Sequence, residues 1–277
     1  MIIGHNLNAL TALHYLNINQ QHMQGAMLRL SSGKQLNSAA DNPAGLIISQ
    51  HMQAQINALN VASKNSQDGI SMFQTADGGL SETQSILQRM NELATEAAND
   101  TNVTLDRNAI KNELTQLGSE ITHIFSSINF NGVPLLSSSA GLTLQIGATS
   151  NAYDSMGINL SSFNIGSSLN NIANGTGINV DNSDNARNSM SVIQNAIDSV
   201  STSRSIVGAY ENRLKYTIDN LDNEADNLTA ADSRITDADM AKEMMEYSKY
   251  NILQQVAQAM LSQSLHNDPE QILKLLE

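Results

Sequence analysis

The six histidines have the widest range of possible chemistry in this chain, because imidazole can bind metals and transfer protons. They are scattered along the sequence: His5, His14, His22, His51, His123 and His266. None lies in a His-Glu-x-x-His pattern or at ligand spacing with carboxylates. The sequence also contains no cysteine, which excludes disulfides and thiolate metal sites. We therefore expect no metal site and no cofactor.

Two further patterns could serve catalysis, and neither has the neighbouring residues that catalysis needs. Gly78-Gly79 lacks the Lys-Ser/Thr pair of a phosphate-binding loop, and no Gly-x-Ser-x-Gly turn occurs. An acidic cluster lies towards the C-terminus: Asp237, Asp239, Glu243 and Glu246. Such clusters are usually solvated helix faces, here near a helix N-terminus where the macrodipole favours carboxylates. The sequence predicts that this protein is not an enzyme.

The charge balance excludes several classes of partner. The chain has 14 Lys and Arg against 27 Asp and Glu, a net charge of −13. A nucleic-acid binder or a protein that docks on anionic membranes needs a basic face, so we expect neither partner. No run of about 18 apolar residues is present, which argues against membrane insertion. The first residues, 1–6, lack the basic and apolar regions of a cleaved secretory signal.

Apolar residues recur at steps of three and four over most of the sequence, which predicts long amphipathic helices. Segment 5–33 has such a stripe, and Gly33 is a plausible helix end. Its members are Leu13, Leu16, Met23, Met27 and Leu30. The pattern resumes over 46–98, where we expect the helix to continue through Gly78-Gly79, and again over 105–128, after a loop at 99–104.

Segment 187–229 has the most regular pattern, a heptad seam with steps of three and four throughout. Its members are Met190, Ile193, Ile197, Val200, Arg204, Val207, Glu211, Leu214, Ile218, Leu221, Ala225 and Leu228. Arg204 and Glu211 interrupt the apolar series. Either they are a polar pair tolerated at an open position, or they fix the register between helices.

The final segment, 236–265, is predicted to begin with Thr236 or Asp237 as its N-cap. Its stripe contains Met245, Ile252, Val256 and Met260. We expect Asn267-Asp268-Pro269 to break the helix. Four large apolar residues then crowd the C-terminus: Ile272, Leu273, Leu275 and Leu276. Apolar surface at such a position implies a partner chain.

The centre of the chain, 138–182, is rich in Gly, Ser and Asn. Alternating apolar residues at 141–147 and 156–160 predict a β-hairpin within it. The predicted fold class is therefore mainly α. The N- and C-terminal segments pair as a coiled coil or long helical bundle, and a small β-hairpin region lies at about 138–182.

Several short motifs occur in an order that resembles bacterial flagellin. Asn6-Leu7-Asn8-Ala9-Leu10, Leu30-Ser31-Ser32-Gly33 and the segment 40–46 are similar to the family's N-terminal signature. Segments 65–71, 87–94, 130–132 and 144–148 follow, and segments 233–241 and 258–261 resemble the C-terminal signature. Each motif alone is weak, but their shared order in a chain without Cys or Trp is a strong signal.

The resemblance implies a structural subunit that polymerises into the flagellar filament for swimming motility. Residues 1–44 and 235–277 would form an inner coiled-coil domain that lines the filament channel, and residues 45–234 an outer helical bundle domain with the hairpin. With so short a centre, little or no further outer domain is expected. A hook–filament junction protein of the same apparatus is the alternative.

The resemblance also implies the partners and the location. The subunit would be secreted by type III export with a flagellar export chaperone, and would meet the cap and hook-junction proteins as part of an extracellular bacterial flagellum. A vertebrate Toll-like receptor would recognise the positions of Arg89, Leu93 and Glu113. Alternatively, Leu93 belongs to the core, and Arg89 and Glu113 lie on a solvated face.

The subunit's main partner would be its own copies. The stripes of both ends stay uncovered in a single chain, so the terminal helices would fold on assembly. The residues assigned to assembly are Leu13, Leu16, Met23, Met27, Leu30, Met245, Ile252, Val256, Met260, Leu273 and Leu276.

Overall fold

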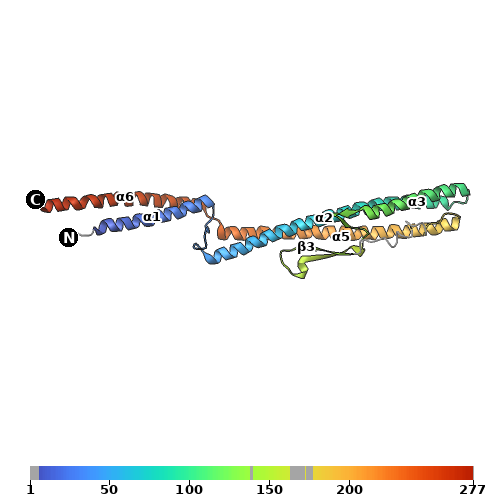
Figure 1. The fold of residues 1–277 in the computed structure, drawn as a ribbon, viewed down its shortest axis with the longest axis horizontal. Coiled ribbons are helices and arrows are strands. Elements are labelled where there is room, and N and C mark those ends of the chain that lie inside the picture. Colours follow the sequence, from blue (N-terminus) through green and yellow to red (C-terminus); the bar gives the residue numbers. More distant parts are fainter. Residues whose placement is uncertain (1–5, 138–139, 163–171, 173–176, 277) are drawn as a thin grey trace. The chain divides into compact units, whose positions relative to one another are not determined.

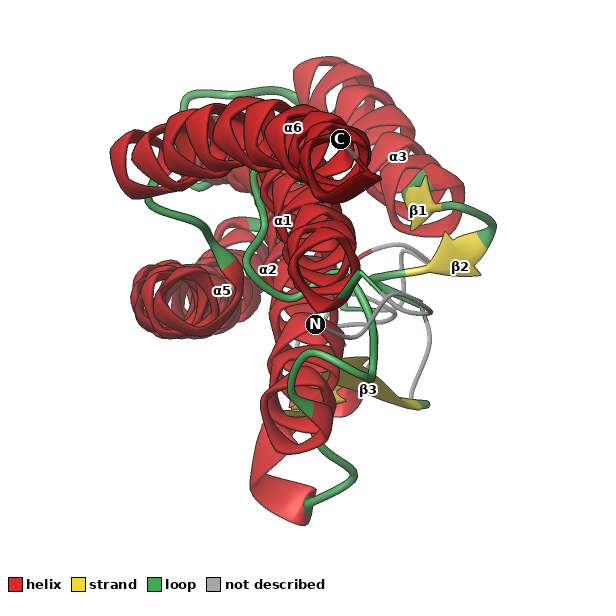
Figure 2. Cartoon of the chain, turned by 90° about the vertical axis from the view of Figure 1, so that its left-hand side faces the viewer, coloured by secondary structure: helices red, strands yellow, loops and turns green. Residues whose placement is uncertain are grey.

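The structure is a computed structural model that describes residues 6–137, 140–162, 172 and 177–276, with side chains as far as Leu265. Its long helices are α1 (Leu7–Ser32), α2 (Pro43–Ala97), α3 (Thr104–Ser127), α5 (Ser183–Thr236) and α6 (Met240–Leu276). The short elements are β1 (Asn129–Phe130), β2 (Val133–Pro134), β3 (Gly141–Gln145), β4 (Ser155–Asn159) and the 3-10 turns η1 (Ala152–Asp154) and η2 (Leu160–Ser162). Helices dominate, as Figure 2 shows, which confirms the predicted mainly α fold class.

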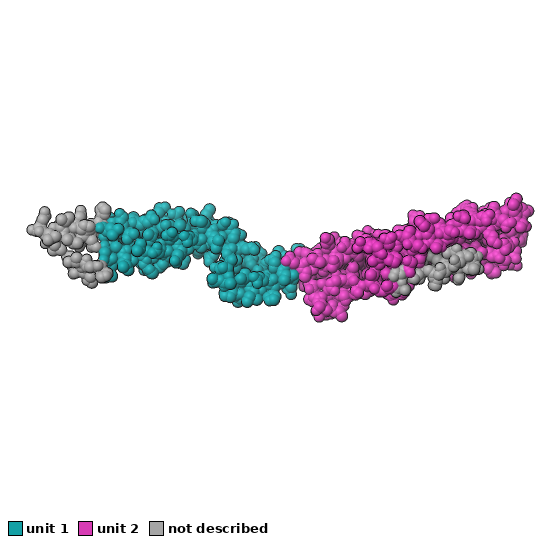
Figure 3. All heavy atoms as spheres, in the orientation of Figure 1, with its two compact units in different colours: residues 1–56, 226–277 teal, residues 57–225 magenta. Residues whose placement is uncertain are grey.

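The chain divides into two compact units, which Figure 3 colours separately. The first unit joins both ends of the chain, residues 1–56 and 226–277. The second unit contains the central residues, 57–225. Helices α2 and α5 each contribute to both units.

The large hydrophobic core lies within the second unit, where α2, α3 and α5 pack together with the strands. The heptad positions Ile193, Val200, Val207, Leu214 and Leu221 of α5 are buried, whereas the positions between them are only half-buried. On the other side of the buried heptad positions, small residues complete the buried face of α5: Ala186, Ser189, Ala196 and Ser203. The predicted seam therefore contains only half of the buried face. The other half consists of small residues, which let α5 approach its neighbours closely.

Arg204 connects α5 to α2. Its Nε lies 2.8 Å from Oδ1 of Asp77, and its Nη1 donates to Oε1 of Gln84 at 2.8 Å. The hydrogen bond to Asp77 raises the pKa of Arg204 above its ordinary value. Phe73 of α2 and Tyr210 of α5 also stack, with ring centroids 5.3 Å apart. These contacts support the interpretation of Arg204 as a residue that fixes the register between helices.

The predicted hairpin is confirmed. Strands β3 and β4 pair antiparallel, with Leu142 opposite Ile158 and Leu144 opposite Met156. A smaller pair, β1 with β2, was not predicted. Its turn consists of Asn131 and Gly132, which adopt φ angles of 50° and 82°. The Asn-Gly dipeptide is the strongest short signal for such a turn, so the sequence did carry this information.

The observed helix ends confirm one prediction and correct two. Gly33 ends α1 in the left-handed conformation, as predicted. The expected N-cap of the last helix at Thr236 or Asp237 is wrong, because α5 continues to Thr236. Asp239 caps α6 instead, since its side chain accepts from the backbone N–H of Ala241 and of Lys242. The expected break at Asn267-Asp268-Pro269 is also wrong, since α6 extends to Leu276. A proline removes one donor and bends a helix without always ending it.

Helix α2 continues through Gly78-Gly79, as predicted, and the two glycines give a matched pair for a stability test. Gly78 is exposed, and an added methyl would meet nothing within 4 Å. We expect Gly78→Ala to raise the free energy of unfolding by about 0.5–1 kcal/mol through helix propensity. Gly79 is buried, and its added methyl would overlap Cδ1 of Ile128. Gly79→Ala should therefore lower the same quantity by about 1–3 kcal/mol.

Urea denaturation of both variants, followed by circular dichroism, measures this difference. Equal changes of the same sign in the two variants would contradict the described packing of α2 on Ile128.

Candidate assembly surface

Helices α1 and α6 lie side by side in the first unit and run antiparallel, as Figure 1 shows. On each helix most of the buried and half-buried residues recur at steps of three and four, and these residues form the seam. On α1 the seam consists of Ala9, Ala12, Leu16, Asn19, Met23, Ala26 and Leu30, with the half-buried Ile18, Gly25 and Arg29 beside it. On α6 it consists of Glu243, Tyr247, Tyr250, Gln254, Ala257, Leu261 and Ser264, with the half-buried Glu246 and Asn251 beside it. This spacing is that of a heptad repeat, typical of a coiled coil.

Three contacts define one antiparallel register along the seam. At one end, Nδ2 of Asn6 donates to the backbone oxygen of Ser264 at 3.1 Å. In the middle, the rings of His22 and Tyr250 stack with centroids 4.8 Å apart. Towards the other end, Nη1 of Arg29 lies 3.4 Å from Oε1 of Glu243.

The chain reversals next to this end of the pair are held by backbone hydrogen bonds. Gln35 N–H donates to the carbonyl of Thr236 at 2.7 Å, and Ala238 N–H donates to that of Gly33 at 2.9 Å. Asp41 closes the turn after α1 by accepting from the backbone N–H of Ser38 at 2.8 Å and of Asn37 at 3.1 Å. These backbone hydrogen bonds lower the pKa of Asp41.

The residues assigned to assembly on α1 fall into two groups. Leu16, Met23 and Leu30 lie in the seam, whereas Leu13 and Met27 are exposed outside it. The residues of α6 behave differently, because none of the four assigned within its described side chains lies in the seam. Met245, Ile252, Val256 and Met260 are 67%, 60%, 52% and 62% exposed. We call these four residues the outer stripe. Leu273 and Leu276 lie outside the described side chains.

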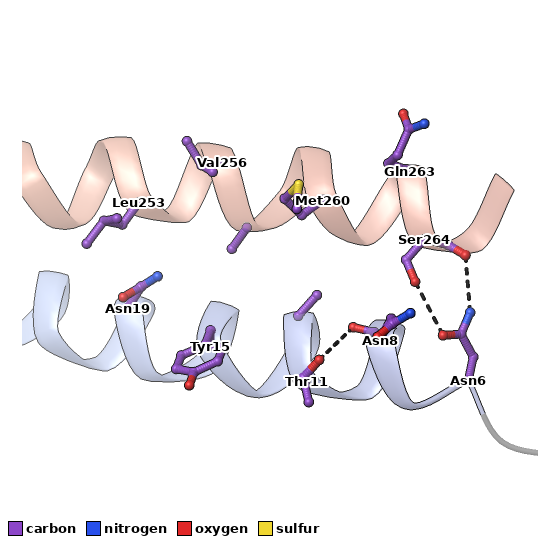
Figure 4. A pocket seen from close by; sticks show the side chains of 12 residues that line it. Asn6, Asn8, Thr11, Tyr15, Asn19, Leu253, Val256, Met260, Gln263 and Ser264 are labelled. Carbon is purple, nitrogen blue, oxygen red and sulfur yellow. Dashed lines mark hydrogen bonds between the residues drawn. The ribbon is translucent and has the colours of Figure 1, made fainter. Parts of the chain in front are cut away.

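A groove of about 710 Å³ runs between α1 and α6. The small residues Ala12 and Ala257 leave room for it, and Tyr15, Leu253, Val256 and Met260 supply its apolar surface. Amide and hydroxyl side chains complete the lining, and the Asn6–Ser264 contact lies at one end, as Figure 4 shows. The outer stripe therefore shares two of its residues, Val256 and Met260, with the groove.

Among the described side chains of the first unit, far more large apolar residues are exposed than apolar residues are buried. The buried apolar residues described there are Ala26, Leu36, Ile56 and Ala257. Its exposed large apolar residues are Leu7, Leu10, Leu13, Tyr15, Met27, Leu28, Ile47, Ile48, Met240, Met244, Met245, Ile252, Leu253, Val256, Met260 and Leu265. Burying one such side chain contributes about 1.5–3 kcal/mol. Exposed apolar side chains in such number are typical of a protein interface.

Sequence reasoning missed the composition of the seam. It assigned the large apolar residues to one stripe per helix, because those residues give the strongest periodic signal. The small and polar residues Ala9, Ala12, Asn19 and Ala26 repeat with the same spacing and were the available signal. Small residues let the two helices approach closely, so most of the large apolar residues of α6 remain for a second surface.

The residues expected to meet a receptor lie in the second unit and do not form one exposed group. Arg89 is exposed and donates to Glu113 through Nη2 at 3.0 Å and to Glu92 through Nη1 at 3.1 Å. The hydrogen bond to Glu113 raises the pKa of Arg89. Leu93 is 2% exposed and belongs to the core.

Neither a metal centre nor a membrane span emerges from the described part of the chain. Within it, no three His, Cys, Asp or Glu side chains gather closely enough to hold a metal ion. No helix among the described residues combines the length and the apolar character that crossing a bilayer requires.

Comparisons with known proteins agree on one family. Residues 3–140 match the model of the bacterial flagellin N-terminal helical region, and residues 190–276 match that of the bacterial flagellin C-terminal helical region. A flagellin of Halalkalibacterium halodurans is 45% identical over 280 residues, which cover all of both chains.

Two solved structures are similar. The crystal structure of Bacillus cereus flagellin has 31% identity and a TM-score of 0.50, covering 61% of this chain and 94% of that one. A putative flagellar hook-associated protein from Vibrio parahaemolyticus has a TM-score of 0.57, covering 71% of this chain and 100% of that one. At 14% identity, this second similarity concerns the fold alone.

Proposed function

This chain belongs to the bacterial flagellin family, and we propose that its copies polymerise through the outer stripe of α6 and the groove between α1 and α6. As a flagellin it is a subunit of the flagellar filament, the structure that serves bacterial motility. The family models and the close relative support this role, and neither favours the hook–filament junction alternative.

The observation that carries the proposal is the position of the large apolar residues of α6. Met245 and Ile252 lie away from the seam, although the seam itself contains alanines and polar residues. If the two helices were stabilised only by contact with each other, their largest apolar side chains would be buried between them. A neighbouring copy that covers the outer stripe supplies the missing burial.

The same imbalance explains why the ends of the chain order when the filament grows. The seam buries too little apolar surface to offset the conformational entropy of α1 and α6. A neighbouring copy adds apolar burial only to the ordered pair, so binding and ordering occur together. Because every copy offers the same surfaces in a head-to-tail arrangement, the contacts extend without closing.

The remaining roles follow from the family. Residues 1–44 and 235–277 would form the inner domain that lines the filament channel, and 45–234 the outer bundle. The subunit would be secreted through type III export and would contact an export chaperone, the cap and the hook-junction proteins. It would act by assembly and catalyse no reaction.

Charge introduced into the outer stripe tests the assembly surface. Val256→Asp should lower the rate of seeded polymerisation at least about a hundredfold, because a carboxylate would be buried against apolar side chains of the neighbouring copy. Gln255→Asp adds the same charge at the adjacent exposed position and serves as the control. Sedimentation of filaments after seeding measures both variants. Polymerisation of Val256→Asp at the rate of the parent chain would refute the proposed surface.

We also propose that Arg89 and Glu113 form the exposed part of the Toll-like receptor site, and that Leu93 supports it from the core. The ion pair holds the guanidinium in one position, which favours recognition by a partner. Arg89→Ala should weaken receptor activation by monomeric protein about tenfold in a reporter-cell assay. Arg187→Ala removes another exposed, ion-paired arginine and should leave the response unchanged. An unaltered response to Arg89→Ala would eliminate this site.

A further inference from the structure

One ion pair, between Glu243 of the seam and Arg29 beside it, does not serve stability. Glu243 is 6% exposed, and only its Oε1 contacts Arg29, at 3.4 Å. Its other oxygen, Oε2, is buried and has no hydrogen-bond partner within the part of the chain that the structure describes. A buried carboxylate with one long contact weakens a helix pair relative to an apolar residue of similar size. The position of Glu243 therefore needs an explanation other than stability.

The other members of the seam specify the register only weakly. The other residues named in the seam are uncharged, and most are Ala, Leu, Met or Tyr at steps of three and four, whereas the half-buried Glu246 lies beside the seam. Such a pattern looks similar after a shift of one heptad, so apolar packing alone permits α1 to slide along α6. In coiled coils a single polar position is enough to select one register, at some loss of stability.

The charges of α1 make Arg29 suited to this selection. Arg29 is the only Lys or Arg between Leu7 and Ser32, and α1 contains no Asp or Glu. Glu243 can therefore meet an arginine or lysine of α1 in one register only. Two α1 helices from different copies could not pair Arg29 with a carboxylate, so the contact also disfavours that wrong pairing.

We propose that the Arg29–Glu243 pair is the specificity-determining contact of assembly, which fixes α1 on α6 in a single antiparallel register. The groove needs this register, because it is lined by Ala12 and Tyr15 of α1 together with Val256 and Met260 of α6. A shift of one heptad would separate these residues and change the surface offered to the next copy. The inference rests on the proposed function, since the register matters for growth only if these surfaces bind other copies.

A charge swap in the full-length chain tests the pair. Because the chain has no cysteine, Asn6→Cys with Ser264→Cys gives a disulfide reporter at the far end of the seam, where the two residues are in contact. In this background, Arg29→Glu or Glu243→Arg should slow seeded polymerisation about tenfold or more. Each should also lower the yield of the intramolecular disulfide in the pelleted filaments.

The double variant Arg29→Glu/Glu243→Arg should recover both quantities to within about threefold of the parent, because it restores opposite charges in the same register. Glu82→Arg makes the same charge change at an exposed position of α2 in the other unit and should leave the disulfide yield unaltered. Thermal unfolding of each monomer, followed by circular dichroism, verifies that the unit of residues 57–225 is still folded.

Two outcomes overturn the inference: a double variant no better than the single ones, or single variants that polymerise like the parent with full disulfide yield. Both leave the proposed assembly surface untouched, because Val256→Asp tests that surface separately. Conversely, normal growth of Val256→Asp would reject the assembly surface whatever the charge swap shows.

Discussion

Most of the large apolar side chains of α6 lie outside its seam with α1 and remain exposed. In a single chain, the seam with α1 combines alanines and polar residues with larger apolar ones such as Leu16, Met23 and Leu261, while Met245, Ile252, Val256 and Met260 are more than half exposed. The hydrophobic effect then favours any arrangement in which another surface removes these side chains from water. Growth by addition of identical copies is the simplest such arrangement, and under the proposed assembly it would make order at the chain ends depend on growth.

The second unit has the opposite character. Its helices bury Phe73, Leu80, Leu87 and Met90 almost completely, and its hairpin packs onto the same core. It can therefore be stable in a single chain. Under the proposed assembly, this division would give the subunit a folded body and two ends that order on growth. A subunit with both ends permanently paired would lack that ordering step.

Much of the architecture could be predicted from the sequence, because long periodic segments and an alternating pattern report directly on helices and a hairpin. The hairpin at 141–147 and 156–160 and the end of α1 at Gly33 are examples. The α6 N-cap could not be placed, since Thr236, Asp237 and Asp239 are all good caps and tertiary contacts decide between them. Nor did periodicity reveal which face of α6 meets α1, because a hydrophobic stripe does not identify its partner.

Amide hydrogen exchange of the monomer and of the filament tests the central claim most directly. If the ends order only on assembly, amides of α1 and α6 in the monomer exchange far faster than those of the buried parts of α2 and α5. In the filament, α1 and α6 should become strongly protected. Protection of α1 and α6 in the isolated monomer equal to that of the 57–225 core would contradict the account.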